Sequence, residues 1–291
     1  MAGELLAIVA PVYVCAGLGY AWSRMGRRYD TELVTELITQ IGAPCLVFSS
    51  LVGIEVEHSA LVQMAGACAA ALLSFAAIGA LTLRLVGLPR RSFLAPLVFP
   101  NVGNMGLPIC LFAFGPEGLA LGVVFYAVTA ISHFTAGQWI WSGRISFRQL
   151  LLTPLAYAAL LAALTLATDA SVPGWILDTT QLLGGFTIPL MQFTLGVALG
   201  QLQLGRVRTA LSLSLFRIGM GLAVGAGLAW ALGMTGLARG VLILDCSMPV
   251  AVFNYMLAER HGRTPSEVAG LVVLSTLISF LSIPLVLAWV L

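Results

Sequence analysis

Long apolar runs recur along the chain and are separated by short polar connections. A helix that crosses a bilayer needs ~20 mostly apolar residues, because the hydrocarbon core is ~30 Å thick. The runs are too long and too continuous for the strands of a membrane β-barrel, in which apolar and polar residues alternate. The pattern predicts ten transmembrane helices, at residues 5–23, 32–53, 59–84, 92–114, 118–142, 150–168, 175–200, 209–233, 238–258 and 265–290.

The composition of the chain favours the same class. Hydrophobic residues make up 59% of the sequence and charged residues only 9%, whereas a soluble domain carries roughly 25% charge. No hydrophilic stretch is long enough for a separate soluble domain, which takes at least ~50 residues. We therefore expect an all-α polytopic membrane protein in a lipid bilayer, with a retained first helix, no metal site and no nucleic-acid partner.

The basic residues are all arginine, and they lie mainly on one side of the predicted helices. Twelve of the fourteen follow the first, third, fifth, seventh and ninth helices: Arg24, Arg27, Arg28, Arg84, Arg90, Arg91, Arg144, Arg148, Arg206, Arg208, Arg260 and Arg263. The opposite connections hold Arg239 and five acidic residues, Glu55, Glu57, Glu117, Asp169 and Asp178. Because short arginine-rich loops stay in the cytoplasm, we expect both termini to be extracytoplasmic, in a bacterial inner membrane.

Prolines recur at matching places in the two halves of the chain. Three ordered pairs, 143, 145 and 149 residues apart, are Pro11 with Pro154, Pro44 with Pro189, and Pro100 with Pro249. A duplicated unit of five helices must enter the membrane in the opposite orientation to its copy, which is the inverted-repeat plan of many secondary transporters. We therefore expect a first repeat over residues 1–148 and an inverted second repeat over residues 149–291.

Two of the predicted helices are poor candidates for straight, lipid-facing helices. Residues 97–108 contain two prolines, two glycines and two asparagines, and residues 244–254 carry a weaker version of this composition. Proline removes a backbone donor and displaces the carbonyl four residues earlier, and unsatisfied backbone groups in hydrocarbon cost several kcal/mol each. Both segments should therefore be interior, interrupted near Pro100 and Pro249 close to the bilayer midplane, and crossed there.

Residues 100–108 read Pro-Asn-Val-Gly-Asn-Met-Gly-Leu-Pro. This segment resembles the Pro-Asn-x-Gly-Asn-x-Gly-x-Pro signature of bacterial members of the auxin efflux carrier family, such as malate or malonate permeases. The resemblance implies a fold like that of the sodium/bile-acid symporters, in which helices 4 and 9 are broken and cross. It also implies a scaffold of helices 1, 2, 6 and 7, a moving transport domain of helices 3–5 and 8–10, and a homodimer formed through the scaffold.

The resemblance also implies a class of substrate. Known substrates across the family are organic anions, namely auxin in plants and malate or malonate for some bacterial members. The connection at residues 142–149 is short, whereas plant members have a long regulatory loop there, so control by phosphorylation of the plant type is not implied.

An interrupted helix offers unbonded groups to a ligand. The half that begins at the interruption presents N–H groups and a positive dipole end, which suit a carboxylate, and the half that ends there presents carbonyls, which suit a cation. The substrate-binding candidates are Pro100, Asn101, Gly103, Asn104, Pro249, Val250 and Asn254. The alternative for the three asparagines is that they only satisfy the interrupted backbone.

Three ionisable residues within predicted helices are candidates for coupling transport to an ion gradient. Asp245 is the only acidic residue deep in such a helix, and intramembrane acids are usually functional or paired, so we expect it to hold a proton or a sodium ion. Arg217 and His133 are the other candidates. The alternatives are that Arg217 extends to the headgroups or forms a fixed salt bridge with Asp245, and that His133 is a packing residue.

These features predict a secondary active transporter that moves a small organic anion by alternating access, without a cofactor. A sodium-coupled symporter of the bile-acid type and a channel are the alternatives that would use the same interrupted helices. A sodium/proton antiporter would be expected to carry an adjacent pair of buried acids. An intramembrane hydrolase is disfavoured, because the sequence holds no HExxH or GxSG motif and only one deep aspartate.

Overall fold

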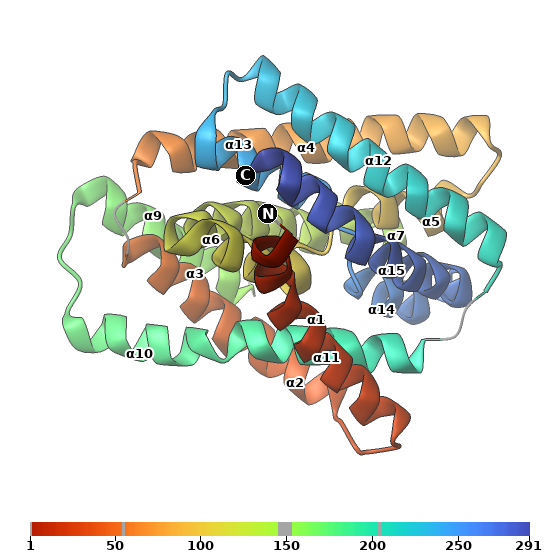
Figure 1. Ribbon diagram of the computed structural model, residues 1–291, viewed down its shortest axis with the longest axis horizontal. Coiled ribbons are helices and arrows are strands. Elements are labelled where there is room, and N and C mark those ends of the chain that lie inside the picture. Colours follow the sequence, from red (N-terminus) through yellow and green to blue (C-terminus); the bar gives the residue numbers. More distant parts are fainter. Residues whose placement is uncertain (1, 54–55, 145–152, 203–204) are drawn as a thin grey trace.

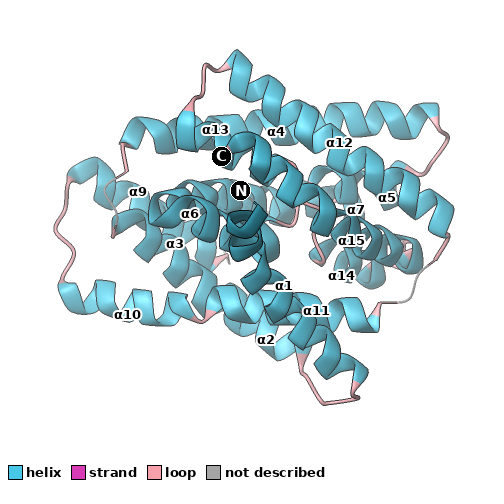
Figure 2. Ribbon diagram, viewed as in Figure 1, coloured by secondary structure: helices cyan, strands magenta, loops and turns pink. Residues whose placement is uncertain are grey.

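The computed structural model describes residues 2–53, 56–144, 153–202 and 205–291. Helices occupy most of these residues, and the described ranges contain no β-strand beyond one isolated backbone bridge (Figure 2). The predicted all-α class is therefore confirmed. Glu55, Arg148, the start of the predicted helix at 150–168 and the predicted repeat boundary after residue 148 lie outside the described residues.

The helices of the first half pass from the N-terminus to the predicted end of the fifth span (Figure 1). They are α1 (Ala2–Arg24), α2 (Thr31–Leu37), η1 (Ile38–Gly42), α3 (Ala43–Val52), α4 (His58–Leu85), α5 (Arg90–Val98), η2 (Val102–Gly106), α6 (Leu107–Ser132), η3 (His133–Gly137) and α7 (Gln138–Ser142). The three η elements are single π-helical turns, a geometry that is frequent at functional sites. The helices of the second half are α9 (Pro154–Thr168), α10 (Gly174–Gly185), α11 (Thr187–Gln201), α12 (Val207–Ala231), α13 (Gly236–Cys246), α14 (Phe253–Arg260) and α15 (Pro265–Val290).

Seven helical stretches among the described residues are long and apolar enough to cross a membrane. Six of them coincide with single predicted runs: Gly3–Arg24, Thr31–Val52, His58–Leu85, Gly174–Gln201, Val207–Ala231 and Pro265–Val290. The seventh, Val102–Ser142, extends over 41 residues and covers the end of one predicted run and all of the next. A multi-span membrane protein is thereby confirmed, whereas the seven stretches found among the described residues do not confirm the predicted number of ten.

The remaining predicted runs are shorter or divided in the structure. The run at 92–114 begins in α5, which has nine residues, and the run at 238–258 is divided between α13 and α14, of eleven and eight residues. The run at 150–168 is described only as α9, which has 15 residues. Helical hydrogen bonding stops after Val98 and after Cys246, so neither of the divided runs contains a continuous helix of membrane-spanning length.

The long stretch Val102–Ser142 is not one straight helix. At Gly115 the backbone has φ 70° and ψ −164°, a conformation that costs glycine little and other residues much. Pro116 follows and has no N–H to donate to the preceding turn. The chain therefore changes direction between the predicted runs 92–114 and 118–142, although both belong to one hydrogen-bonded stretch.

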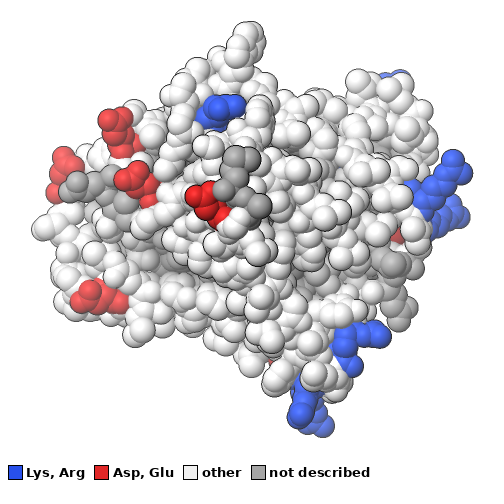
Figure 3. Space-filling model, viewed as in Figure 1, with Lys and Arg blue, Asp and Glu red and all other residues white. Residues whose placement is uncertain are grey.

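The helices pack most extensively within two groups of neighbours, which also contact each other where α6 meets α3 and α1. In one group α1 packs against α11, and α3 packs against α9 and α10; in the other α12 packs against α4, α13 and α15. Figure 1 shows α4, α12 and α13 along the upper edge and α10 and α11 along the lower edge. On the face drawn in Figure 3, acidic side chains gather at the left end, while basic side chains are visible at the right end and at the lower tip.

Close contact between α1 and α11 depends on two glycines. A Cβ atom at Gly19 would overlap the backbone carbonyl of Phe193, and a Cβ atom at Gly196 would overlap the carbonyl of Ala16. Small residues let helix backbones approach closely in membranes, where van der Waals packing replaces the hydrophobic effect as the main attraction between helices. The pair Gly19 and Gly196 therefore sets the spacing of α1 and α11.

Replacing Gly19 by alanine should force the two helices apart and lower the unfolding free energy by about 1–3 kcal/mol, the usual cost of overpacking. Gly17→Ala is the matched control, because a Cβ at Gly17 meets no atom within 4 Å. Thermal unfolding of the purified proteins in detergent measures the stability of both variants. Equal melting temperatures for Gly19→Ala and the unsubstituted protein would contradict the close approach.

Candidate functional site

The two segments singled out by their prolines meet through their backbones. Pro100 and Val250 form an antiparallel bridge. Asn101 N donates to Pro249 O at 2.8 Å, and Ala251 N donates to Phe99 O at 3.2 Å. Each interrupted segment thus supplies the hydrogen-bond partners that the other has lost by leaving helical geometry, which removes the penalty for exposed backbone in an apolar environment.

The bridge is supported from a third element. Val250 N donates to Ser275 Oγ of α15 at 3.0 Å, and Ser275 Oγ donates in turn to Val272 O. All the residues from Phe99 to Val102 and from Ser247 to Ala251 are buried. The crossing is therefore an enclosed, largely satisfied backbone contact.

A cavity of about 880 Å³ lies against the crossing. Its lining includes Pro100, Asn101, Gly103 and Asn104 from the first segment and Ala251–Phe253 from the second. The cavity also reaches residues of α2, η1 and α11, and it extends to Glu32, Glu259 and Arg260. It therefore connects the crossing with one end of the molecule, where α14 ends in Arg260.

Asn101 lines the cavity, and its buried amide nitrogen, Nδ2, has no hydrogen-bond partner. Its side chain is 4% exposed, and it does not cap the helix that begins at Val102. The first N–H groups of a helix have no partner within it, so the start of η2 adds unbonded donors beside this amide. The interpretation that Asn101 only satisfies interrupted backbone does not fit this geometry.

Asn254 differs from Asn101. It is fully buried and does not line the cavity, and its Nδ2 donates to Ala251 O at 3.2 Å. Pro249 and Val250 are also buried away from the cavity and contribute through their backbones. These three predicted residues therefore build the crossing, whereas Pro100, Asn101, Gly103 and Asn104 also face the cavity.

His133 lies in an aromatic wall of the cavity. Its ring stacks on Phe99, with ring centroids 4.1 Å apart and an angle of 5° between the planes, and it meets Phe253 edge-on at 5.3 Å. Phe134 contacts Phe253 in the same way at 5.2 Å. His133 is 6% exposed and its Nε2 has no partner. His133 therefore packs between aromatic rings, as the alternative interpretation of the sequence expected, and it also lines the cavity.

Asp245 lies behind the crossing and outside the cavity. It is fully buried, its Oδ1 accepts from Cys110 Sγ at 3.7 Å, and its Oδ2 has no partner. A Cβ at Gly106 would overlap Asp245 Oδ1, and one at Gly122 would lie 3.6 Å from Oδ2. The carboxyl group therefore lies against the backbone of η2 and α6. Other residues of η2, Gly103 and Asn104, line the cavity, whereas Asp245 does not.

Arg217 is also fully buried, so it does not extend to the headgroups. Its Nη1 donates to Cys246 O at 3.2 Å, and its guanidinium lies 4.5 Å from the ring centroid of Phe75. Cys246 is the last residue of α13, whose C-terminal carbonyls attract a cation. Arg217 and Asp245, both within the described residues, form no ion pair with each other, and Arg217 Nε and Nη2 have no partner.

Comparison with known proteins shows to which class of membrane protein the chain belongs. The profile of a family described as membrane transport protein matches residues 5–144 and 140–287. The chain belongs to this family. It is 26% identical to an uncharacterized transporter of Methanothermobacter thermautotrophicus over 295 residues, which cover 95% of each chain. It is 28% identical to an uncharacterized transporter of Methanocaldococcus jannaschii over 198 residues, or 64% of this chain and 63% of that one.

The family match confirms the resemblance to the auxin efflux carriers that residues 100–108 indicated. It also indicates a membrane transporter rather than an enzyme. In a transporter, a cavity of this size that ends at the crossing of two interrupted segments is a place for a solute, so the cavity beside Asn101 is the candidate transport site.

Sequence reasoning missed the wall of this site that faces the crossing. Thr31, Thr35 and Thr39 line the cavity from α2 and η1, and Met191 and Thr194 line it from α11. The three threonines recur every four residues, which places them on one helix face, and this threonine stripe at the start of the predicted run 32–53 was the available signal. Tyr126 of α6, whose ring lies 3.0 Å from a Cβ built at Gly103, carried no such signal.

The cavity predicts which positions water-soluble thiol reagents reach. Asn104→Cys should be modified by a polar maleimide in detergent, because Asn104 lines the cavity and is half-buried. Asn254→Cys is the control and should stay unmodified, because Asn254 is fully buried outside the cavity. Peptide mass spectrometry distinguishes these sites from the native cysteines. Equal modification of both variants would contradict the cavity as described.

Proposed function

We propose that this membrane transport protein is a secondary transporter that carries a small organic anion by alternating access, with the anion held at the crossing. The observation that carries the proposal is that the large cavity ends at Asn101, beside the start of η2, and that the buried Nδ2 of Asn101 has no hydrogen-bond partner. Helix N-termini attract carboxylates through their N–H groups and dipole. The residues of both crossing segments that line this end, Pro100–Asn104 and Ala251–Phe253, carry no charge that would repel an anion.

The proposed architecture is the ten-span inverted repeat with crossed, broken helices 4 and 9. The backbone bridge between α5–η2 and α13–α14 supports it, because the two interruptions lie at matching prolines of the two halves. The packing groups support the division into domains. Helices α1, α2–α3, α9 and α10–α11 form the scaffold, and α4–α7 with α12–α15 form the transport domain. The scaffold also forms a homodimer.

The proposed mechanism moves one domain against the other around the site. Glu32 of α2 and Arg260 of α14 both line the cavity, so the cavity lies between the two proposed domains. It extends to Arg260, which belongs to the arginine-rich side of the predicted helices. With that side in the cytoplasm of a bacterial cell, the structure corresponds to an inward-facing state, and both termini lie on the outer side.

A carrier fits the crossing better than a channel does. On the side of the crossing away from the cavity, four residues are fully buried: Leu244, Asp245, Cys246 and Met248. A channel needs a continuous polar path, whereas a carrier needs only one open side at a time. A sodium-coupled symporter uses the same geometry and differs only in the ion that accompanies the anion.

The substrate proposal is tested with proteoliposomes and three family substrates, malate, malonate and auxin. At least one of these anions should show saturable uptake. Asn101→Ala should raise the half-saturating concentration about tenfold, the equivalent of one charge-assisted hydrogen bond of about 1.4 kcal/mol. Gln40→Ala is the control and should leave uptake unchanged, because Gln40 lies in η1, is exposed and does not line the cavity.

Uptake of cations or neutral solutes alone would contradict the anion proposal. Saturable anion uptake that is unaffected by Asn101→Ala would leave the transporter class intact but move the site away from the crossing.

We further propose that Asp245 is the coupling group, which binds a proton or a sodium ion as the anion moves. Its unpaired Oδ2 and the contact of its Oδ1 with the backbone of η2 support this role, because a change at Asp245 acts directly on the segment that lines the site. Without an ion pair to Arg217, a purely structural salt bridge is not the reason for its burial.

Asp245→Asn should leave the protein folded and able to exchange substrate across the membrane, but should abolish uptake driven by a proton or sodium gradient. Exchange and gradient-driven uptake are measured in the same proteoliposomes. Asp178→Asn, which replaces an exposed acid, is the control and should keep both activities. Normal gradient-driven uptake by Asp245→Asn would remove Asp245 from the coupling mechanism.

A further inference from the structure

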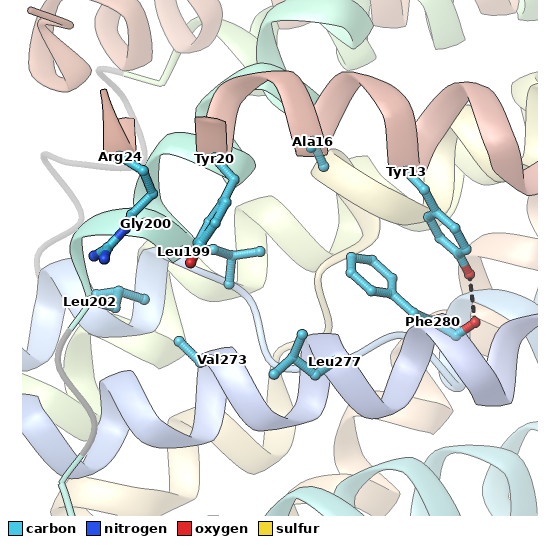
Figure 4. Close-up of a pocket in the computed structure, with 11 residues that line it drawn as sticks. Tyr13, Ala16, Tyr20, Arg24, Leu199, Gly200, Leu202, Val273, Leu277 and Phe280 are labelled. Atoms are coloured by element: carbon cyan, nitrogen blue, oxygen red, sulfur yellow. Dashed lines mark hydrogen bonds between the residues drawn. The ribbon is translucent and has the colours of Figure 1, made fainter. Parts of the chain in front are cut away.

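A second cavity lies between α1, α11 and α15. It has a volume of about 450 Å³ and is lined mainly by apolar side chains (Figure 4). Residues of α1 form one wall, Leu199 and Gly200 of α11 form the second, and Val273 and Leu277 of α15 form the third. Apart from Leu202, none of its lining residues belongs to the cavity at the crossing.

One end of this crevice is closed by a contact between α1 and α15. Tyr13 Oη donates to Phe280 O at 3.0 Å, and the two rings lie 4.4 Å apart (Figure 4). Pro284 follows Phe280 by four residues and has no N–H, so it cannot form the helical hydrogen bond to Phe280 O. Tyr13 satisfies this carbonyl and thereby ties the two helices together at the closed end.

The other end of the crevice carries a positive charge. Arg24, the last residue of α1, lines the cavity there (Figure 4) and forms no ion pair within the described part of the chain. Arg27 and Arg28 follow in the next connection. An apolar crevice with a cation only at its end is complementary to a ligand with an apolar body and an anionic head.

The crevice is open to the surroundings of the helices. Tyr20 is 46% exposed and Leu277 is 50% exposed. A Cβ at Gly17 would meet no atom within 4 Å, so this part of the crevice contains no protein atoms. For helices that span a membrane, these surroundings are lipid acyl chains.

The length of the crevice matches one leaflet of a bilayer. Tyr13 and Arg24 are eleven residues apart on α1, which corresponds to ~16 Å along a helix, and half of a hydrocarbon core is ~15 Å thick. Arg24 belongs to the arginine-rich end of the molecule, at the level of the headgroups. An acyl chain in the crevice would therefore end near Tyr13 and place its phosphate at Arg24.

We propose that this crevice binds one anionic phospholipid, with an acyl chain between α1 and α15 and the headgroup phosphate on Arg24. A phospholipid fits better than a soluble ligand, because the crevice is open along its side to the bilayer and only its end is charged. The proposal is independent of the transported substrate, since Asn101 and the other residues of the crossing take no part in it.

The test is native mass spectrometry of the purified protein released from nanodiscs. The nanodiscs contain phosphatidylglycerol and phosphatidylcholine with identical acyl chains in equal amounts. The unsubstituted protein should retain one phosphatidylglycerol in preference to phosphatidylcholine. Arg24→Gln should lower this preference about fivefold, the effect of one arginine near an anionic headgroup. Gly17→Phe, which fills the crevice, should abolish retention of either lipid.

Two controls accompany these variants. Arg27→Gln removes a neighbouring charge outside the crevice, and Leu18→Phe adds a ring to an exposed neighbouring position of α1. Both should retain phosphatidylglycerol as the unsubstituted protein does. Equal retention of the two lipids by the unsubstituted protein, unchanged retention by Arg24→Gln, or an equal loss in Arg27→Gln would overturn the proposal. A melting temperature for each variant separates a lost lipid from a lost fold.

Discussion

The antiparallel bridge between Pro100 and Val250 is the contact on which the rest of the site depends. Prolines prevent both segments from continuing as helices, and unsatisfied backbone groups in an apolar medium cost several kcal/mol each. The bonds from Asn101 N to Pro249 O and from Ala251 N to Phe99 O satisfy groups of both segments at once. Neither interruption would be stable without the other, so the two halves of the chain must meet at this point.

The position of the cavity follows from this contact. Because the bridge occupies the backbone groups at the centre of the crossing, the free groups are those at its edge, the start of η2 and the side chain of Asn101. The two buried charges also lie around it. Arg217 binds the carbonyl end of α13, and Asp245 lies against η2. Leaving buried charges unpaired is costly, which is the physical reason for proposing Asp245 as the coupling group.

Much of the fold follows from local properties of the sequence. The apolar run 59–84 matches α4, His58–Leu85, and the run 265–290 matches α15, Pro265–Val290. The agreement is close because the thickness of a bilayer sets the length of a spanning helix, and the apolar run shows that length in the sequence. The residues of the Pro-Asn-x-Gly-Asn motif lie on the cavity, since unbonded backbone in a membrane protein must line protein or water.

The details that could not be predicted depend on contacts between distant segments. The depth of Asp245 and Arg217 follows from their positions along their helices, but which way each points depends on packing, and they point to different partners. Asn101 and Asn254 look equivalent in the sequence, yet one faces the cavity and the other is enclosed. The stacking of His133 on Phe99 joins residues that are far apart in the chain, so no local pattern reveals it.

The most direct measurement is a disulfide across the crossing. Pro100 and Val250 oppose each other between the two backbone hydrogen bonds, a pairing in which Cα atoms lie about 4.5 Å apart, within the range that a disulfide spans. The protein with both Pro100→Cys and Val250→Cys should form this disulfide under mild oxidation in membranes, as detected by mass spectrometry of the linked peptides. Pro100→Cys with Val241→Cys, whose second position lies within α13, ~8 Å before its end at Cys246, should not form it. A folded Pro100→Cys and Val250→Cys protein without the linked peptides would contradict the crossing.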